Sequence, residues 1–345
     1  PCCRDDDIRR SDAVEIGSVA VMGKADEFGA PVEVDAGGRI VAITNPDKPM
    51  FPSVGPAEEP RTKLDLARYY LAVGDALMPT VRDRPVLLER YPNGVRDKSF
   101  FQKRIPDSAP DWLETTTVET INGTPSRALV IADLAHVLWA VNMGVLGLHV
   151  WPFRASTPLD HDEMRIDLDP SPGVTFDMVR ESAGHVRDLL AEFGMIGFPK
   201  TTGSKGIHVY LRVKPEYTFL QLRHAALGVA REIERRRPEL ATSKWWKEER
   251  GERVFLDYNR MARDQTIASA YSVRARPSAT VSAPITWDEV PQVTIEDFDI
   301  WSMRERFDDL GDVHAAIEDV HHDLQPLLDL YEGSGEGDAP YPPQF

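Results

Sequence analysis

Hydrophobic and polar positions recur with two different periods along this chain, and together the two periods predict a mixed α/β fold. Strict alternation over residues 32–35 and 39–43, on either side of two glycines, predicts a pair of short strands. Apolar side chains three and four residues apart predict a helix over residues 64–78, and a long apolar run predicts a buried helix over 131–146. A shorter apolar run predicts another strand over residues 85–90.

Strand and helix patterns alternate in the second half of the chain. The predicted strands cover residues 164–168, 197–201, 207–213 and 254–258, and the predicted helices cover 175–193, 219–237 and a last region within 304–330. This order favours an α+β fold class in which helices flank central β-sheets. We expect an irregular N-terminal arm over residues 1–35, one folded domain over 36–330, and a disordered acidic tail over 331–345.

The composition argues against a membrane protein and against a disulfide-stabilised scaffold. The chain of 345 residues has no apolar run close to the roughly 20 residues that cross a bilayer, and residues 1–10 lack the apolar stretch of a secretory signal. Its two cysteines, Cys2 and Cys3, are adjacent, so they cannot form a disulfide framework or a zinc ribbon. These features predict a reduced, soluble, cytoplasmic protein without a membrane partner.

The charge is unevenly distributed, which keeps nucleic acid open as a partner. The net charge is −16, but residues 296–345 alone contribute 14 acidic residues against two arginines. Residues 200–276 carry 17 Lys and Arg against 9 Asp and Glu, a local net charge of +8. Because a local field steers a polyanion more than the total charge does, global acidity does not exclude a DNA or nucleotide ligand.

The hexapeptide RIDLDP at residues 165–170 is the most informative segment. In a strand, Asp167 and Asp169 project from the same face, while Ile166 and Leu168 point into the core. Two adjacent carboxylates repel each other unless a cation lies between them, and hard oxygen ligands favour magnesium or manganese. A strand end with two merely solvated acids is the alternative interpretation of the same residues.

The segment TTGSKGIH at residues 201–208 lies between two predicted strands. It offers backbone N–H groups in a glycine-containing loop, several hydroxyls, the ammonium of Lys205 and the imidazole of His208, a set that suits a triphosphate. The segment does not match the Walker A pattern. Its alternative interpretation is a hairpin-like turn beside a core histidine.

A third acid, Asp257, follows the apolar strand that begins at Val254. Three acids can hold two divalent ions roughly 3.5–4 Å apart, an arrangement that serves phosphoryl transfer. A buried acid that simply pairs with an arginine is the alternative, because the chain around this strand is rich in arginine: Arg250, Arg253, Arg260, Arg263, Arg274 and Arg276.

The order of RIDLDP, TTGSKGIHVY, VFLDYNRMARDQTIASAYSVR and PSATVSAPITW resembles the polymerase domain of bacterial ligase D, a branch of the archaeo-eukaryotic primase superfamily. The resemblance runs from about residue 43 to residue 287 and includes ITNPDKPMFP, RYPNGV, SFFQKR and LGLHVWPF. It implies a primase-type catalytic core, with central β-sheets between helices.

The resemblance also implies roles for individual residues. The metal-binding catalytic acids are Asp167, Asp169 and Asp257. The residues that bind the incoming nucleotide are Thr202, Ser204, Lys205, His208, His149, Arg250 and Arg274, with Thr202 standing where the family usually has serine. The DNA-binding residues are Phe100, Phe101 and Arg90, and the residues that hold a 5′-phosphate are Asn45, Lys48 and Lys63.

Several of these residues have an ordinary structural interpretation when the sequence is considered without the resemblance. Two consecutive aromatics such as Phe100 and Phe101 would place one side chain in the core and one outside. Lys48 and Lys63 would be solvated surface lysines, and His149 would be a core histidine.

The function implied is a template-directed nucleotidyltransferase that fills short gaps or extends ends in DNA repair. The resemblance implies two divalent metal ions, with manganese preferred and magnesium possible, and a preference for ribonucleotides. The expected partners are DNA with gaps or broken ends, a downstream strand bearing a 5′-phosphate, nucleoside triphosphates, Ku and a separate ligase, in the bacterial cytoplasm at the nucleoid.

Residues 24–27 lack the glycine of a ligase K-x-D-G motif, so we expect a stand-alone enzyme or an excised domain. Two functions from other classes stay open, namely a non-catalytic DNA-end binder and a metal-dependent nucleotide phosphohydrolase.

Overall fold

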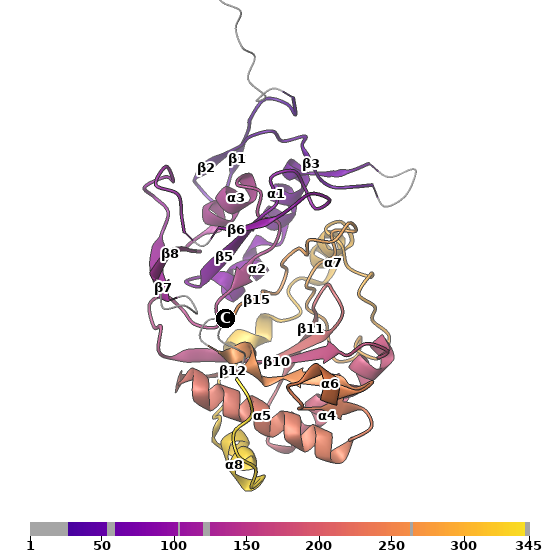
Figure 1. Cartoon of the computed structure of the whole chain (residues 1–345). Helices are drawn as coiled ribbons and strands as arrows, with labels where there is room; N and C mark the ends of the chain where they lie inside the picture. Colours follow the sequence, from indigo (N-terminus) through magenta and orange to yellow (C-terminus); the bar gives the residue numbers. More distant parts are fainter. Residues whose placement is uncertain (1–26, 54–58, 103, 120–124, 263–264, 342–345) are drawn as a thin grey trace, which may run out of the picture.

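A computed structural model of the protein describes residues 27–53, 59–102, 104–119, 125–262 and 265–341. Cys2, Cys3 and most of the predicted N-terminal arm lie outside the described residues. The mixed α/β fold class is confirmed, since two sheets with flanking helices lie one above the other in Figure 1. The first half of the chain builds the upper sheet, and most of the second half builds the lower one.

The upper sheet has six strands: five follow the order β15-β9-β5-β8-β7, and β6 pairs with the far end of β5. Two small hairpins and three helices pack around this sheet. The strands of the sheet are β5 (Pro85–Arg90), β6 (Phe100–Gln102), β7 (Thr115–Glu119), β8 (Pro125–Val130), β9 (His149–Val150) and β15 (Ile267–Ala268). The hairpins are β1 (Val32–Asp35) with β2 (Ile40–Ile43), and β3 (Pro49–Phe51) with β4 (Arg61–Thr62); the helices are α1 (Lys63–Ala72), α2 (Gly74–Val81) and α3 (Leu134–Asn142).

The lower sheet has the order β11-β12-β10-β14-β13, antiparallel except for the parallel pair β13 and β14. Helices α4 and α5 cover one face of this sheet, and α8 packs on α5. The strands are β10 (His161–Pro170), β11 (Phe198–Thr201), β12 (Ile207–Tyr217), β13 (Ala241–Thr242) and β14 (Val254–Asp257). The helical elements are α4 (Phe176–Glu192), α5 (Phe219–Arg236), α6 (Lys247–Arg250), η2 (Tyr258–Met261), α7 (Ser302–Leu310), η3 (Ala315–Asp319) and α8 (Gln325–Gly333).

Helices α4 and α5 lie where the sequence predicts them, because threonines cap both N-termini. The hydroxyl of Thr175 accepts a hydrogen bond from the amide of Met178 at the start of α4. At the start of α5, Thr218 and Gln221 form a reciprocal capping box. A side-chain cap supplies an acceptor for the unpaired amides of the first turn, which fixes where a helix begins.

The two apolar helices of the upper part differ from their predictions. The helix predicted over residues 64–78 is broken into α1 and α2 at Val73, directly before Gly74, the residue type least favourable in a helix interior after proline. A Cβ at Gly74 would lie 2.6 Å from Cδ1 of Leu134, so the glycine allows α3 to pack closely. The helix predicted over 131–146 spans only Leu134–Asn142, because Asp133 caps its start and Gly144, with φ of 83°, turns the chain after its end.

The C-terminal segment differs from the predicted disordered tail over its described residues 331–341. Helix α8 continues to Gly333, and the following residues lie against α5. An arginine on α5 holds this segment: Arg223 donates hydrogen bonds to the carboxylate of Asp338 and to the carbonyl of Ala339.

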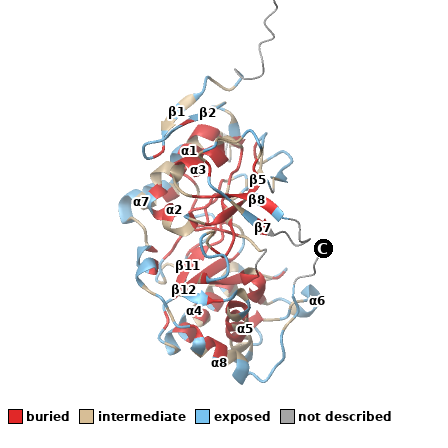
Figure 2. Ribbon diagram, turned by 90° about the vertical axis from the view of Figure 1, so that its left-hand side faces the viewer, coloured by how far each residue is buried: buried red, intermediate tan, exposed pale blue. Residues whose placement is uncertain are grey.

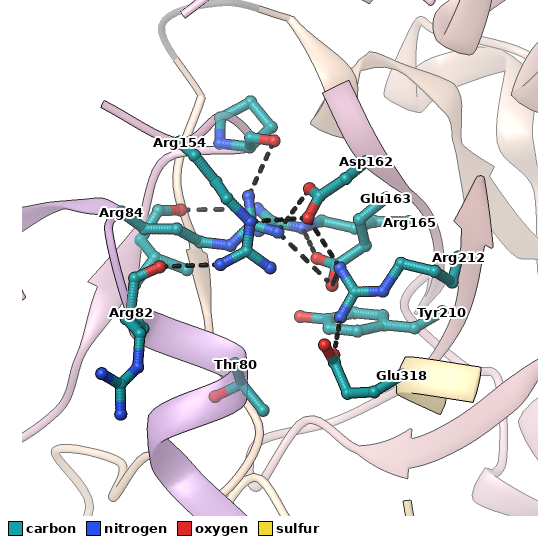
Figure 3. A network of polar contacts seen from close by, with 12 residues as sticks. Thr80, Arg82, Arg84, Arg154, Asp162, Glu163, Arg165, Tyr210, Arg212 and Glu318 are labelled. Carbon is teal, nitrogen blue, oxygen red and sulfur yellow. Dashed lines mark hydrogen bonds and ion pairs between the residues drawn. The ribbon is translucent and has the colours of Figure 1, made fainter. Parts of the chain in front are cut away.

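One continuous core joins the two sheets. Figure 2 shows buried residues from α1 and α3 through both sheets to α5, and the largest apolar cluster contains residues from every one of these elements. A buried ion network adds polar links at the junction (Figure 3). Asp162 on β10 accepts hydrogen bonds from Arg84, Arg154 and Arg212, at 2.7, 2.7 and 2.9 Å. This network fixes the first half of β10, the strand that carries the predicted acids.

Candidate active site

The three predicted acids lie together on the lower sheet, because strand register brings them side by side. Asp167, at the centre of β10, lies opposite Asp257 on β14 and opposite His208 on β12. Directly opposed residues in neighbouring strands project from the same face of a sheet. Ile166 and Leu168 are buried under the helices on the other face, as their alternation predicts.

Oxygens of Asp167, Asp169 and Asp257 lie within 4.8 Å of one another, close enough to hold a common cation. Arg260, from the η2 turn, reaches all three carboxylates. Its guanidinium lies 2.8 Å from Asp167, 3.1 Å from Asp257 and 3.7 Å from Asp169. The solvated-strand-end interpretation of Asp167 and Asp169 is therefore wrong for Asp167, which is buried, whereas Asp169 is half-buried. Asp257 is buried and pairs with an arginine, as its own alternative interpretation states.

The donor set fits a divalent cation. Oδ1 of Asp167 is buried and makes no hydrogen bond to any described residue. Nε2 of His208 lies 3.2 Å from this oxygen but outside hydrogen-bonding geometry. A buried carboxylate oxygen without a donor is costly, and a cation bound there would compensate it. Three carboxylates provide the hard oxygen ligands that magnesium and manganese prefer.

The three acids differ in electrostatic environment. Burial and the negative charge of Asp167 raise the pKa of Asp169 to about 6. Burial also raises the pKa of Asp257, although Arg260 opposes this shift. Burial alone would raise the pKa of Asp167 too, but the positive charge of Arg260 outweighs it and holds that pKa well below its usual range. Asp167 is thus the carboxylate most firmly ionised at neutral pH.

The loop between β11 and β12 is organised by Thr202. Its Oγ1 accepts hydrogen bonds from the amides of Ser204, Lys205 and Gly206 at 3.0 to 3.1 Å, which bends the loop around the hydroxyl. Gly206 passes so close to the β10 backbone that a Cβ there would lie 2.2 Å from the carbonyl oxygen of Leu168. The loop is therefore held directly beside the acid-bearing strand.

A cavity of about 960 Å³ opens between this loop, the end of β10, the N-terminal end of α4 and α6. Asp169, Ser204, Lys205, Lys247 and Arg250 line it. Arg250 is held by the carbonyl oxygens of Lys244 and Trp245, at 3.1 and 2.7 Å. The lining thus combines carboxylate groups with several cationic side chains.

Two more of the residues predicted to bind the nucleotide, Arg274 and His149, approach the acids from the side of the upper sheet. Arg274 packs on Gly203, where a Cβ would lie 2.6 Å from Cγ of Arg274. His149 on β9 is half-buried, and burial together with the positive charges of Arg274, Lys200 and Arg260 lowers its pKa to about 3. Burial and Lys200 also lower the pKa of His208 to about 3. Both imidazoles are therefore neutral at pH 7.

The predicted DNA residues lie at the edge of the upper sheet. Phe100 and Phe101 are 46% and 58% exposed, so the interpretation that places one of them in the core is wrong. The guanidinium of Arg90 lies 5.3 Å from the ring centre of Phe100 and donates to the carbonyl of Met143 at 2.7 Å. The β5–β6 pairing thus presents two solvent-facing aromatic rings beside a fixed cation.

The predicted phosphate residues are also close together. The amide of Lys48 donates to the carbonyl of Asn45, and the amide of Lys63 donates to that of Lys48. Lys63 is only 6% exposed, which overturns its interpretation as a solvated lysine. Burial, Lys48 and Arg90 lower its pKa to about 8. The buried Oδ1 of Asn45 makes no hydrogen bond within the described part of the chain.

Residues 62–314 match the sequence model of the family described as LigD, primase-polymerase domain. The chain belongs to this family. Members of the LigD primase-polymerase family are nucleotidyltransferases, and membership agrees with the fold class and with the resemblance drawn from the motifs.

Individual relatives give the same result. A multifunctional non-homologous end joining protein LigD of Mycolicibacterium smegmatis is 32% identical over 81% of this chain and 36% of its own length. A bifunctional non-homologous end joining protein LigD of Bacillus subtilis is 36% identical over 67% of this chain and 37% of its own length. The chain thus spans about a third of the length of these curated relatives.

A solved structure of the LigD family also has the same fold. The polymerase domain of Mycobacterium tuberculosis ligase D, determined in complex with DNA, is 30% identical and superposes with a TM-score of 0.74. The match covers 82% of this chain and 99% of that chain. Within the described ranges of this LigD-family chain, no helix is both long and apolar enough to cross a membrane.

Sequence reasoning missed two cations of the site. Arg260 appears in the sequence as one of six arginines near β14, and only the tight η2 turn shows that it contacts the acids. Lys200 ends its predicted strand without any motif, yet its Nζ is buried and donates to the carbonyl of Ala268 and to Ser282. Burial and Arg274 lower the pKa of Lys200 well below its usual range. The one sequence feature that could have indicated a role for Lys200 is its position inside a strand that is otherwise predicted to be buried.

Proposed function

We propose that this chain is a template-directed, DNA-dependent nucleotidyltransferase that fills short gaps or extends ends in DNA repair, as in non-homologous end joining. The cluster of Asp167, Asp169 and Asp257, of which Asp169 also lines the cavity beside Lys205 and Arg250, carries the proposal. Carboxylates alone suit a cation, whereas carboxylates beside cationic side chains suit a cation-bound polyphosphate. The DNA complex of the mycobacterial domain supports DNA as the second substrate.

In this proposal the three carboxylates hold two divalent cations. When bound, these cations lower the pKa of a primer 3′-hydroxyl and offset charge on a nucleoside triphosphate. Lys205 and Arg250 from the cavity wall, and Arg274 from beside Gly203, bind the triphosphate. Attack of the hydroxyl on the α-phosphorus releases pyrophosphate, so negative charge grows on the leaving group. Fixed cations at that position stabilise the transition state more than the ground state.

The remaining nucleotide residues position the reacting groups. Thr202 fixes the loop through three backbone amides, and Ser204 is one of the cavity-lining residues that the loop presents. His208 lies against Asp167 and limits the rotation of that carboxylate. His149 is neutral at pH 7 and lies among cations, so it is suited to hydrogen bonding with the nucleotide rather than to charge compensation.

The exposed face of the upper sheet binds the template and the downstream strand. Phe100 and Phe101 stack on bases at the break in the duplex, where each stacked base contributes about 1–3 kcal/mol. Arg90 holds the phosphate backbone beside them. Lys48, Lys63 and the amide of Asn45 bind the 5′-phosphate, which two lysine ammonium groups attract as point charges.

Further parts of the proposal concern the preferred substrates and partners. Manganese is preferred over magnesium, ribonucleotides are preferred over deoxyribonucleotides, and the enzyme works with Ku and a separate DNA ligase at the nucleoid in the bacterial cytoplasm. The names of the curated relatives, all of which are end-joining proteins, support this context.

Extension of a labelled primer on a gapped duplex with a downstream 5′-phosphate tests the function directly. We expect metal-dependent extension that is stronger with manganese, stronger with ribonucleotides and stronger with the 5′-phosphate. Replacing Asp167 and Asp169 with alanine should reduce extension to background while circular dichroism stays unchanged. Asp177→Asn is the matched control, because Asp177 lines the same cavity but lies on α4. Extension by the double alanine variant would contradict the metal assignment.

The same reaction separates the two other candidate functions. Gel shift of the gapped duplex without extension under any metal or nucleotide condition would favour a DNA-end binder. Free nucleoside phosphates without extended primer, resolved by thin-layer chromatography, would favour a phosphohydrolase. Extended primer with a stoichiometric yield of pyrophosphate is the outcome that we expect.

A further inference from the structure

Residues 336–341 form an extended segment along α5, which we name the C-terminal strap. It lies beyond the residues 62–314 that match the family. Arg231 on α5 donates to the carbonyl of Gly337 at 2.6 Å and pairs with Glu336 at 3.2 Å. From there the strap runs towards the N-terminal end of α5 and reaches Arg223, two turns earlier in the helix. The strap therefore joins the C-terminal helix to the region beneath the acid cluster.

Arg223 is the residue on which the strap converges. Its side chain is fully buried, and Nη1 lies 2.5 Å from Oδ1 of Asp338. Nη2 donates to the carbonyl of Ala339 at 2.6 Å. The guanidinium lies between two aromatic rings, 5.1 Å from the ring centre of Tyr258 and 3.9 Å from that of Tyr341. A buried guanidinium needs an anionic partner and acceptors for its donors, and the strap supplies both.

The third nitrogen of Arg223 connects the strap to the acid cluster. Nε of Arg223 donates to Oδ1 of Asn259 at 2.7 Å, and Nδ2 of Asn259 donates to the carbonyl of Pro340 at 3.2 Å. Both ends of the Asn259 amide are thus occupied. The backbone N–H of Asn259 donates to Oδ1 of Asp257 at 2.9 Å. Asn259 alone therefore links the strap to a carboxylate of the acid cluster, and Arg223 supports Asn259 from the strap side.

We propose that the C-terminal strap is a positioning element of the active site, which acts through Arg223 and Asn259 to fix the carboxylate of Asp257 for cation binding. The inference rests on the proposed metal role of Asp257. Without the strap, Arg223 loses its carboxylate partner and Asn259 loses one of its two side-chain contacts. The η2 turn then loosens, and the three carboxylates are no longer held in a cation-binding arrangement.

Two truncated chains test the strap. One ends at Gly335 and lacks the whole strap, and the other ends at Tyr341 and keeps every strap contact described above. Hydrogen–deuterium exchange of the metal-free proteins, followed by mass spectrometry, reports on the peptide 254–262. We expect faster exchange in this peptide only for the chain that ends at Gly335. Titration with Mn²⁺, followed by electron paramagnetic resonance, should show about tenfold weaker binding for the same chain, a typical loss when an outer contact of a metal ligand is removed.

Point variants and a rescue distinguish positioning from general stability. Asp338→Asn should reproduce the faster exchange and the weaker Mn²⁺ binding, even if the shorter chain does not fold. Asp329→Asn is the control, because Asp329 on α8 pairs with Gln325 and not with α5. A synthetic peptide of residues 336–345, added to the chain that ends at Gly335, should restore slow exchange. The same peptide with asparagine at position 338 should not.

Unchanged exchange in 254–262 and unchanged Mn²⁺ affinity, in both the Gly335 chain and D338N, would overturn the inference, whatever happens to the melting temperature. That result would make the strap a cover for α5 alone. Failure of the proposed function gives a different result: in the full chain, Asp257→Asn would then leave Mn²⁺ binding unchanged. The exchange measurement needs no metal, so it decides the role of the strap in either case.

Discussion

Arg260 lies among three carboxylates whose oxygens are within 4.8 Å of one another. Like charges at this distance repel, and burial adds to the cost. The Arg260 guanidinium contacts all three acids, so it compensates part of the charge that bound metal would otherwise compensate. Arg260 contacts the Oδ2 atom of each acid, so a cation that also used these oxygens would compete with the guanidinium.

Arg260→Gln should destabilise the metal-free protein and make the acid cluster more responsive to metal. Removing one partner from a largely buried ion cluster costs about 3 kcal/mol. We expect a lower melting temperature for R260Q without metal, and a larger stabilisation by added Mn²⁺ than in the unmodified protein. Differential scanning fluorimetry with and without Mn²⁺ measures both effects.

Arg235→Gln is the control for this variant, since Arg235 makes an exposed pair with Glu232 that contributes little. Equal Mn²⁺ stabilisation of R260Q and the unmodified protein would show that Arg260 and the cation do not share the same oxygens.

At the scale of elements, the long capped helices and the buried strands could be predicted from the sequence, and the short edge strands could not. Thr175 and Thr218 mark the starts of α4 and α5, and the apolar periods of both helices are long enough to be unambiguous. Strands β6 and β13 have three and two residues, too short for any alternation to appear. They pair with the neighbouring strands β5 and β14, but no alternation in their own residues marks them as strands.

Thr202→Val should loosen the whole β11–β12 loop and weaken nucleotide binding. Valine keeps the shape of threonine but removes the acceptor of three backbone amides, each of which contributes about 1 kcal/mol when paired. We expect the KM for the nucleoside triphosphate to rise about tenfold or more, since this is the loss expected for about 1.4 kcal/mol of binding. Steady-state primer extension at varied nucleotide concentration measures the change.

Thr202→Ser is the matched control, because serine keeps the hydroxyl and loses only a methyl group. T202S should bind nucleotide nearly as well as the unmodified protein. Equal KM values for T202V and T202S would mean that the loop keeps its shape without the hydroxyl.

For the whole molecule, the sequence predicts which acids come together better than it predicts the long-range contacts that hold them in place. Period-2 alternation places Asp167 and Asp169 on one face, and a separate apolar strand supplies Asp257. The strand order that sets Asp167 between Asp257 and His208 joins residues far apart in the chain. The contact between Arg223 and Asp338 spans 115 positions and contradicts an acidic, glycine-rich composition that favours disorder.

The free energy of unfolding should fall at acid pH, because the fold buries histidines in their neutral form. Burial and the positive charges of Arg84 and Arg165 lower the pKa of His161 to about 4, and burial lowers that of His314 to about 4 as well. An unfolded histidine has a pKa near 6.5, so the unfolded chain binds more protons between about pH 6.5 and 4. The stabilising contribution of each neutral histidine is complete above that window and is lost as the pH falls through it.

Urea unfolding of the unmodified protein and of His161→Phe, at pH values from 7 to 4.5, measures this effect. The phenylalanine variant has no proton to bind, and neither nitrogen of His161 has a hydrogen-bond partner in the described ranges that the substitution would remove. The unfolding free energy of the unmodified protein should fall by about 2 kcal/mol more than that of H161F over this range, since one proton contributes about 1.4 kcal/mol per pH unit. His321→Gln, at an exposed position, should follow the unmodified protein. Parallel pH profiles for H161F and the unmodified protein would mean that His161 binds its proton equally well in the folded and unfolded chains.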